Sequence, residues 1–268
     1  MSCPSVLVDW QRRHLDSLRK ESFRRSATRD VTVLAYYFRA EKECHDNFWQ
    51  TEFAFLKTFQ TQGLLPSVLV VNRKSEMVLE FCNRYSIEIQ VAENLVPGQI
   101  ETLALDMVEN LHARFSTDYV LTIQDDGFPM RSGLEEFVGK YDYIGAPWVR
   151  HSTYYDLYPA KYMVGNGGFS LRSRALCEIA SKTYRKWFRH LPYWWFVAGD
   201  DTFYCKTLRF WFRNAVRGIK WPTPSEAARF SIDTNDRLLP SEPPLGFHSE
   251  GFLRYIRYLD GEKGKPDK

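Results

Sequence analysis

Two pairs of adjacent acidic residues are the features of this 268-residue sequence best suited to chemistry. The first pair is Asp125-Asp126, which follows the apolar run 119–123 and Gln124. Adjacent carboxylates repel each other unless something neutralises them, and a divalent metal bound together with a diphosphate would do so. Mg²⁺ and Mn²⁺ prefer oxygen ligands and usually take one or two protein carboxylates plus phosphate oxygens. The alternative is a solvated turn, because Asp-Asp-Gly is ordinary turn chemistry.

The second pair is Asp200-Asp201. It lies between the aromatic run 193–198 and a helix predicted from Thr202, so one of its carboxylates could be the N-cap of that helix. Beside an apolar wall the charged form of a carboxylate is disfavoured, which makes the group a better proton acceptor. The pair therefore also predicts a general base, and a cap on one carboxylate leaves the other available.

The glycine-rich stretch 165–168 (GNGG) is a third candidate. Glycine has no Cβ, so the backbone here can come close to a ligand or to another strand. The stretch does not match the phosphate-binding fingerprints of P-loop or dinucleotide-binding proteins. We predict a turn that faces a sugar, with Phe169 at the start of a strand and Arg172 pointing at a charged group.

His248 is the fourth candidate. Of the six histidines, it alone lies in a turn with the residues of a site around it, the stretch 244–248. A neutral imidazole can bind Mn²⁺. A lone histidine is more often packed in a core or exposed, and both interpretations stay open at this point.

Alternating strands and helices position the first acidic pair. The pattern predicts strands over 31–38, 66–71, 87–91 and 119–123, separated by helices over 47–59, 75–85 and 99–115. Such alternation predicts an α/β fold with a mostly parallel sheet and helices on both faces. Ligands of open parallel sheets bind beyond the carboxyl ends of the strands, where Asp125-Asp126 stands.

The rest of the chain gives weaker signals. We predict helices over 174–189 and 201–216 and mostly irregular structure over 221–250, which is rich in proline. We treat residues 30–255 as one domain with two halves, 30–128 and 129–255. A basic arm over 1–29 precedes the domain, and a polar tail over 256–268 follows it.

Composition limits the function classes. A net charge of +3 is too small to indicate a nucleic-acid partner. Five cysteines without a Cys-x-x-Cys spacing predict neither a disulfide framework nor a zinc site, and they favour a reducing compartment such as the cytoplasm. We see no secretory signal and no apolar run near the roughly 20 residues that a membrane span needs.

The stretch 183–196 (TYRKWFRHLPYWWF) is both basic and aromatic. Trp, Tyr and Arg suit a membrane interface, so the stretch predicts peripheral contact with a membrane. The alternative is that these aromatic rings line a cleft or the core.

Taken in order, six motifs resemble those of a bacterial and viral family that has long been catalogued as a domain of unknown function among polysaccharide-biosynthesis genes. The family is similar to GT-A glycosyltransferases. The motifs are QDDGF (124–128), YDYIGAPW (141–148), GNGGFSLRS (165–173), GDDTFY (199–204), AARFS (227–231) and PLGFH (244–248).

The resemblance implies a GT-A fold whose half 30–128 binds a nucleotide-sugar and whose half 129–255 binds the acceptor. It implies transfer from a nucleotide-sugar, a UDP-sugar above all, to a glycan or lipid-linked glycan acceptor, with inversion, in surface-polysaccharide biosynthesis. Two departures stand out. The metal motif Asp-x-Asp of GT-A enzymes corresponds to Gln124-Asp125-Asp126 here, and the Glu-Asp of the family corresponds to Asp200-Asp201.

The resemblance also implies roles for single residues. Mn²⁺ or Mg²⁺ would be held by Asp126 and His248, with Asp125 either assisting as a metal ligand or holding the donor ribose. Asp201 would be the catalytic base, with Asp200 beside it. The remaining donor-binding residues would be Gln124, Gly167, Gly168 and Arg172, and the acceptor-binding residues would be Trp148, Asn166 and Phe169.

Two other functions remain open. A nucleotidyltransferase that makes nucleotide-sugars would share the sheet and the metal carboxylates, but the stretch after the first strand, 38–42, lacks the glycine-rich loop that grips a triphosphate. A carbohydrate-binding module without enzymatic activity would explain the aromatic residues but gives the two acidic pairs no role.

Overall fold

The structure is a computed structural model of the chain, and it describes residues 5–28, 30–38, 47–148, 163–191, 199–233, 240, 242–249 and 251. The predicted polar tail and the end of the basic aromatic stretch, residues 192–196, lie outside these ranges. Among the described residues, no helix is both long enough and apolar enough to cross a bilayer.

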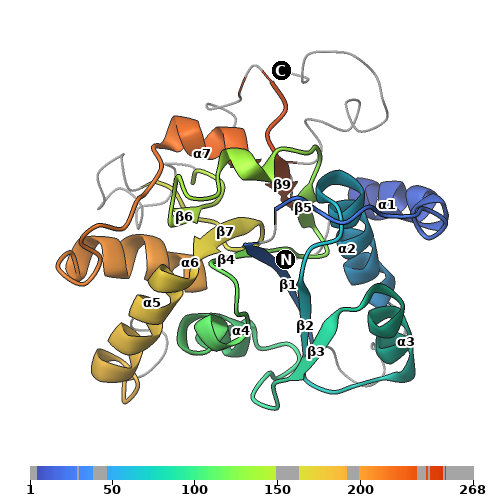
Figure 1. The fold of residues 1–268 in the computed structure, drawn as a ribbon. Coiled ribbons are helices and arrows are strands. Elements are labelled where there is room, and N and C mark those ends of the chain that lie inside the picture. Colours follow the sequence, from blue (N-terminus) through green and yellow to red (C-terminus); the bar gives the residue numbers. More distant parts are fainter. Residues whose placement is uncertain are drawn as a thin grey trace.

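A six-stranded sheet forms the centre of the molecule (Figure 1), with the strand order β3-β2-β1-β4-β7-β6. Its strands are β1 (Val31–Tyr37), β2 (Ser67–Val71), β3 (Glu88–Val91), β4 (Tyr119–Thr122), β6 (Tyr143–Ile144) and β7 (Ser170–Ser173). The first four run parallel, as predicted, and β7 is antiparallel to both β4 and β6. The predicted α/β fold with a mostly parallel sheet is therefore confirmed.

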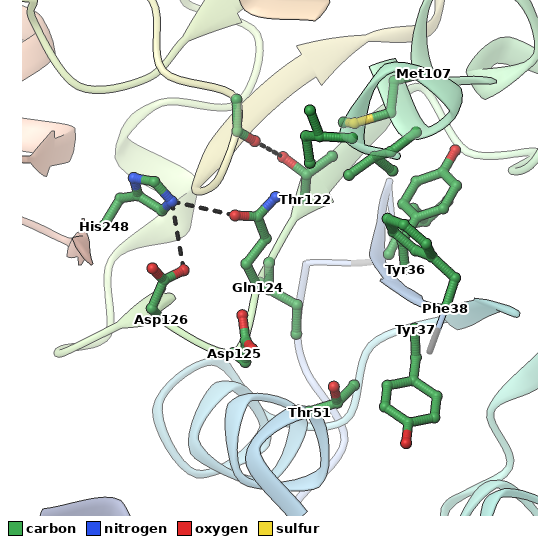
Figure 2. Close-up of a pocket in the computed structure, with 15 residues that line it drawn as sticks. Tyr36, Tyr37, Phe38, Thr51, Met107, Thr122, Gln124, Asp125, Asp126 and His248 are labelled. Carbon is green, nitrogen blue, oxygen red and sulfur yellow. Dashed lines mark hydrogen bonds and ion pairs between the residues drawn. The ribbon is translucent and has the colours of Figure 1, made fainter. Parts of the chain in front are cut away.

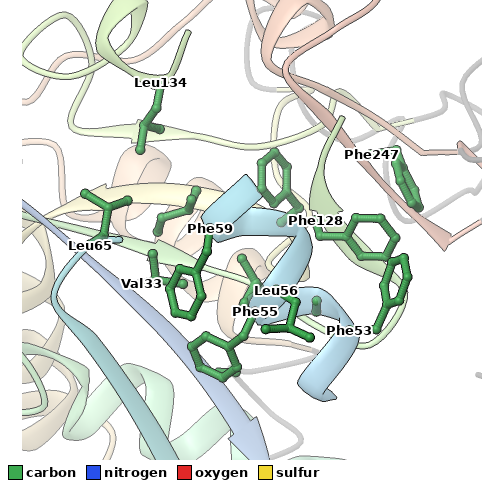
Figure 3. Close-up of a cluster of buried hydrophobic side chains, with 14 of the residues drawn as sticks. Val33, Phe53, Phe55, Leu56, Phe59, Leu65, Phe128, Leu134 and Phe247 are labelled. Atoms are coloured by element: carbon green, nitrogen blue, oxygen red, sulfur yellow. The ribbon is translucent and has the colours of Figure 1, made fainter. Parts of the chain in front are cut away.

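Helices cover both faces of the sheet because neighbouring strand residues point to opposite sides. In β1, Val33 and Ala35 join a core with α2 (Phe48–Gln62) and α3 (Glu76–Tyr85), whereas Leu34 joins a second core. The second core contains α4 (Ile100–Glu109), the turn η1 (Leu111–Ala113) and α5 (Arg174–Trp187). Figure 3 shows the phenylalanines of α2 in the first core, close to Phe128.

The first helix, α1 (Ser5–Leu18), packs against α2. Its buried side includes Trp10, whose ring meets Phe53 edge-on at 5.5 Å between centroids. The stretch predicted as a basic arm thus contains a helix that contributes to the core.

The second half contains more regular structure than the sequence indicated. The prediction of mostly irregular structure over 221–250 was wrong in part, because this stretch holds α7 (Pro224–Phe230) and two strands, β8 (Ser231–Ile232) and β9 (Gly246–His248). With β5 (Gly127–Pro129) these strands form a second sheet in the order β5-β9-β8.

The helix predicted over 201–216 is shorter than expected. It begins with α6 (Asp200–Thr202), continues as the π-helix η5 (Phe203–Trp211) and ends there. A short helical turn, η2 (Leu134–Glu136), precedes β6. π-helical turns are rare in proteins overall, but those that occur are often at functional sites. This one directly follows the second acidic pair.

Candidate functional site

A cavity of about 470 Å³ lies at the carboxyl ends of β1 and β4. The strand order changes direction here, because β2 and β3 lie on one side of β1 whereas β4 lies on the other. Such a switch point is where open α/β sheets bind their ligands. Five predicted site residues line the cavity, namely Gln124, Asp125, Asp126, Gly167 and His248. Figure 2 shows how those in the turn after β4 and in β9 are arranged.

The second sheet brings the first acidic pair to the histidine. In the antiparallel pairing of β5 with β9, Gly127 lies opposite His248, and Ser249 N donates to the Asp126 carbonyl at 2.8 Å. Residues more than a hundred positions apart are therefore held side by side by backbone pairing. The sequence signal for this pairing was weak, because each strand has only three residues.

Three side chains converge at this end of the cavity. His248 Nε2 lies 3.1 Å from Gln124 Oε1 and 3.4 Å from Asp126 Oδ1. Burial opposes the charge on both members of the pair, but their mutual attraction outweighs it. The pKa of Asp126 is therefore held below its ordinary value, and the pKa of His248 is raised.

These three groups fit a divalent ion that also takes phosphate oxygens. They offer one carboxylate oxygen, one amide oxygen and one imidazole nitrogen. Both oxygens lie within 3.4 Å of the nitrogen, close enough for one ion to contact all three atoms. Asn166 Nδ2 lies 3.0 Å from His248 Nδ1, and where that amide donates to it the ring is neutral with its hydrogen on Nε2. Binding a metal through Nε2 requires that hydrogen to be lost or moved to Nδ1.

The predicted metal set of Asp125, Asp126 and His248 is not assembled. Among the described residues, no group of three His, Cys, Asp or Glu side chains is placed to hold a metal ion. Asp125 lines the cavity, but Figure 2 shows its carboxylate apart from the Asp126–His248 pair. The physical reason is the turn after β4, which sends neighbouring side chains in different directions, so that Gln124 and not Asp125 joins His248.

The other end of the cavity is apolar and aromatic. It is lined by Tyr36 and Phe38 from the end of β1, and by Ile100, Leu103 and Met107 from α4. Ile100 is 64% exposed, although it is apolar. These residues carry no sequence signal for a ligand, because apolar residues at a strand end and on an amphipathic helix are equally typical of a core.

A buried charge fixes this end. Tyr36 donates from its hydroxyl to Asp106 Oδ2 at 2.8 Å, and Arg114 pairs with Asp106 at 2.6 Å. Asp106 is fully buried, so the bond and the ion pair compensate for the loss of its hydration. Burial, followed by the charge of Asp106, raises the pKa of Tyr36 well above its ordinary value, and the hydroxyl stays neutral.

The glycine-rich turn joins the two acidic pairs. Asn166 has a left-handed backbone with a φ of 64°, and its side chain donates to Asp233 Oδ2 at 2.7 Å as well as to His248. Its backbone N–H donates to Asp201 Oδ2 at 3.0 Å. A Cβ on Gly168 would overlap the His248 imidazole, so only glycine leaves room for the histidine there.

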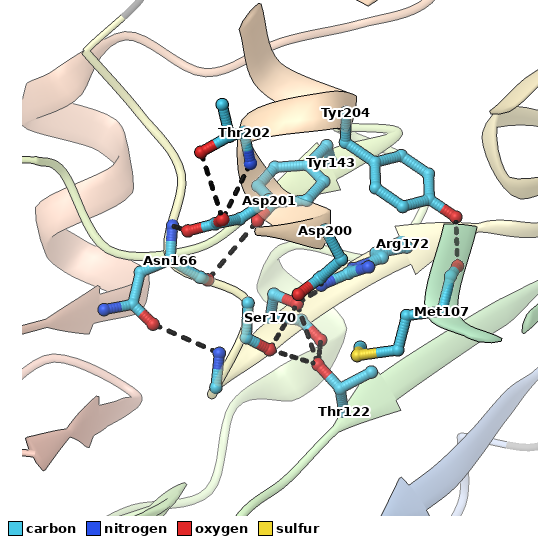
Figure 4. A network of polar contacts seen from close by, with 12 residues as sticks. Met107, Thr122, Tyr143, Asn166, Ser170, Arg172, Asp200, Asp201, Thr202 and Tyr204 are labelled. Carbon is cyan, nitrogen blue, oxygen red and sulfur yellow. Dashed lines mark hydrogen bonds and ion pairs between the residues drawn. The ribbon is translucent and has the colours of Figure 1, made fainter. Parts of the chain in front are cut away.

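Asp200 and Asp201 lie behind this turn, outside the lining of the cavity (Figure 4). Asp201 accepts hydrogen bonds from the backbone N–H groups of Asn166 and Thr202. Burial and then the neighbouring charge of Asp200 raise the pKa of Asp201, which is the direction that a general base needs.

Arg172 has a different place from the one predicted. It is fully buried, donates to Asp200 Oδ2 at 2.5 Å, and lies 5.4 Å and 4.7 Å from the ring centroids of Tyr143 and Tyr204. The charged group at which it points is therefore Asp200. A direct contact with a donor is ruled out in this arrangement, because Arg172 has no exposed surface.

The predicted acceptor residues also separate. Phe169 is fully buried and stacks on Phe230 with 5.0 Å between centroids, so it belongs to the core and does not face a ligand. Trp148 is partly exposed, and Lys206 Nζ lies 4.4 Å from its ring centroid. Burial lowers the pKa of Lys206 to about 8.

Solved glycosyltransferases have similar folds. The X-ray structure of the mannosyltransferase Ktr4p from S. cerevisiae in complex with GDP matches at a TM-score of 0.50 and 6% identity, over 83% of this chain and 77% of Ktr4p. A glycosyltransferase involved in glycosylation of the major capsid of PBCV-1 matches at 0.45 and 13%, over 86% and 98%. The mannosyltransferase PcManGT from Pyrobaculum calidifontis, solved with GDP-Man and Mn²⁺, matches at 0.38 and 14%; the match spans 82% of this chain and 62% of PcManGT.

At such identities these likenesses concern the fold, and only the match to Ktr4p is close enough to support it. No curated protein matches the sequence significantly. The model of a protein family described as "Protein of unknown function (DUF5672)" matches residues 73–248, which is more than half of the chain and contains all six motifs named above. The chain belongs to this family, DUF5672.

Proposed function

We propose that the protein is a glycosyltransferase that moves a sugar from a nucleoside diphosphate sugar to a carbohydrate acceptor. The observation that carries the proposal is the cavity at the switch point of the sheet. One end offers metal ligands from Gln124, Asp126 and His248, which could hold a diphosphate through a bound metal, and the other offers aromatic and apolar surface. A ligand with a charged diphosphate and a flat base matches both ends.

In this proposal the nucleoside lies at the aromatic end, between Tyr36 or Phe38 and the exposed side of α4. Asp125, at the middle of the cavity, is placed to accept a hydrogen bond from the ribose. We keep the UDP-sugar as the predicted donor, and we include GDP-sugars in the tests because Ktr4p was solved with GDP.

Mn²⁺ or Mg²⁺ would be held by Asp126 and His248, with Gln124 in the place predicted for Asp125. The ion, when bound, would neutralise negative charge on the departing diphosphate. Gly168 leaves the space in which the imidazole can reach this position.

The proposed chemistry is an inverting displacement. The Asp201 carboxylate takes the proton of an acceptor hydroxyl, and the hydroxyl oxygen forms a bond to the anomeric carbon. The bond from that carbon to the diphosphate oxygen breaks, and its electron pair leaves with the diphosphate. Asn166 and Thr202 hold the carboxylate in place, and Trp148 offers a ring face to the acceptor sugar.

A thermal-shift screen of nucleotide-sugars with and without Mn²⁺ tests the proposal, because a ligand that binds only the folded state raises its stability. We expect one nucleoside diphosphate to stabilise the protein, more strongly with Mn²⁺. Incubation of that donor with the protein should then release the free nucleoside diphosphate, by transfer or by slow hydrolysis.

The screen separates the other two functions. A nucleotidyltransferase would be stabilised by a nucleoside triphosphate and would form nucleotide-sugar from a sugar phosphate. A carbohydrate-binding module would bind glycan and ignore both nucleotide and metal. Either result would overturn the proposal.

A further inference from the structure

A basic aromatic surface lies at the ends of α5 and η5, away from the cavity. We define it by three exposed apolar residues, Trp187, Leu191 and Trp211, and by four exposed cations, Lys186, Arg189, Arg213 and Arg217. The side chains of Trp187, Leu191 and Trp211 are 56%, 43% and 69% exposed. Large apolar side chains that are this exposed and lie together mark an interaction site.

The two segments that form the surface touch each other. Phe212, next to Trp211, packs against Trp187 with 6.3 Å between ring centroids and against Phe188 with 5.5 Å. Trp211 packs edge-on against Phe210 at 5.0 Å. The residues of α5 and those of η5 therefore form one continuous surface.

Helix geometry accounts for the buried rings of α5, and Trp187 lies beside them. In α5 and the turn after it, Tyr184 and Phe188 are four residues apart, and both are buried in the second core. Trp187, three residues after Tyr184, lies at the edge of this buried side and is more than half exposed. The interpretation of 183–196 as core holds for Tyr184 and Phe188 but leaves Trp187 unexplained, and none of the surface residues lines the cavity.

The charge of the surface has one sign. The sequence has no Asp or Glu from 179 to 199 or from 202 to 225. Among the described residues, Lys186, Arg189, Arg213 and Arg217 form no ion pair with a carboxylate. Lys186 lies over the Trp187 ring at 5.2 Å and Arg213 over the Phe210 ring at 5.2 Å, so two of the four cations lie over rings of the same two segments.

We propose that this basic aromatic surface docks the protein on an anionic lipid bilayer. Tryptophan prefers the headgroup region, where its ring is amphipathic, and cations beside it are attracted to anionic headgroups. Lysine and arginine can keep their charges at the headgroups while their carbon chains follow the apolar surface. The attachment is peripheral and reversible, since a few side chains bind and no helix inserts.

Vesicle flotation with the full chain tests this inference. We would compare phosphatidylcholine vesicles with vesicles that contain about 30% phosphatidylglycerol, at low and high salt. We expect binding to the anionic vesicles alone, weakened by salt. The charge variant K186E/R213E and the ring variant W187S/W211S should each reduce the partition coefficient at least about tenfold, since each cation near the surface contributes appreciably.

The matched control is K74E/L79S, which makes the same kinds of change around α3, on the opposite side of the sheet in Figure 1. It should bind vesicles like the parent protein, and circular dichroism should show all variants folded. Equal binding to neutral vesicles, or full binding by both surface variants, would overturn the proposal. So would light scattering that shows a dimer lost in W187S/W211S, because a second copy would then be the occupant. The flotation experiment contains no nucleotide-sugar. Its outcome therefore does not depend on whether the protein transfers sugar, and the two proposals can fail independently.

Discussion

Asp125 and Asp126 are adjacent in the chain but have different surroundings. Asp126 contacts His248, whereas Asp125 faces the middle of the cavity and its carbonyl accepts a hydrogen bond from Gln11 at 2.6 Å. We predict that D126N abolishes the strengthening of nucleoside diphosphate binding by Mn²⁺, because it removes the only carboxylate in the metal set. Calorimetry with and without Mn²⁺ measures this effect.

The control for this experiment is D125N, which changes the neighbouring residue by the same atoms. It should keep the effect of Mn²⁺ and weaken binding of the nucleotide itself, because a ribose contact is lost. If D125N abolishes the metal effect and D126N keeps it, the metal set is wrong.

Asp201 should give the rate its dependence on pH. Its pKa is raised by burial and by Asp200, and a base acts only when deprotonated, so the rate should rise with pH through that raised pKa. We predict that D201N lowers turnover by about 10²–10⁴-fold and removes this acidic limb. A variant that is folded, keeps its rate and keeps the same pH profile would exclude Asp201 as the base.

At this scale the sequence predicted positions better than roles. Asp126 and His248 were predicted as ligands because a strand end and a turn motif can be recognised in the local sequence. The structure brings the two side chains together. The contribution of Gln124 depends on where the small sheet places His248, which is a tertiary contact. All four residues of β7 and Phe169 before it are buried, so alternation along this stretch could not separate core positions from ligand-facing ones, and Phe169 and Arg172 were assigned to ligands.

Among the elements, the glycine-rich turn is the one that fixes the distance between histidine and sheet. A methyl group at position 168 would meet the His248 imidazole and Gln124 Oε1. We predict that G168A folds but loses the Mn²⁺ effect on nucleotide binding at least about tenfold, since the imidazole must move away.

Gly98 provides the control, because its φ is +80° and nothing lies within 4 Å of a Cβ there. G98A introduces backbone strain without a collision, so it should lose stability and keep the Mn²⁺ effect. Loss of the effect in both variants would indicate general destabilisation and contradict the role of position 168.

The ion pair between Arg172 in β7 and Asp200 in α6, which we call the brace, links these two elements. Asp200 is the only carboxylate that pairs with the buried Arg172 among the described residues. D200N should cost about 3 kcal/mol of unfolding free energy, because it leaves a buried charge unpaired. R172M/D200N should recover part of that loss, since it removes the charge as well, and urea unfolding of the two variants measures both values.

A double variant no more stable than D200N would contradict this account of the brace.

The strands show which parts of the fold local sequence patterns predict and which they do not. Three of the four parallel strands, β1, β2 and β4, were predicted because each lies in a short, mainly apolar run that needs no partner to be identified, whereas in β3 (EIQV) apolar and polar residues alternate. Strands β8 and β9 have two and three residues, and the pairing of β9 with β5 links segments more than a hundred positions apart, so no local pattern predicts them.

At the scale of the whole molecule, the two cores on either side of the sheet support different parts of the candidate site. The core with α4 and η5 carries the wall of the cavity and the second acidic pair, whereas the core with α2 supports the turn after β4. Helix α1 extends the latter core, and through Gln11 it reaches the backbone of Asp125. The N-terminal helix is therefore connected to the site as well as to the fold.

Two tryptophans, Trp10 in α1 and Trp187 at the end of α5, should differ in their contributions to stability and to the site. Trp10 is 1% exposed and packs on Phe53, whereas Trp187 is 56% exposed. W10A should lower the free energy of unfolding by about 3–5 kcal/mol, because a large buried ring is replaced by a cavity, and W187A should change it by under about 1 kcal/mol. Urea unfolding measures both. Since α1 holds the Asp125 turn, W10A should also weaken nucleotide binding under conditions in which it is still folded, whereas W187A should not. Equal stability of the two variants would mean that α1 is a detachable arm, as the basic sequence of residues 1–29 alone suggests.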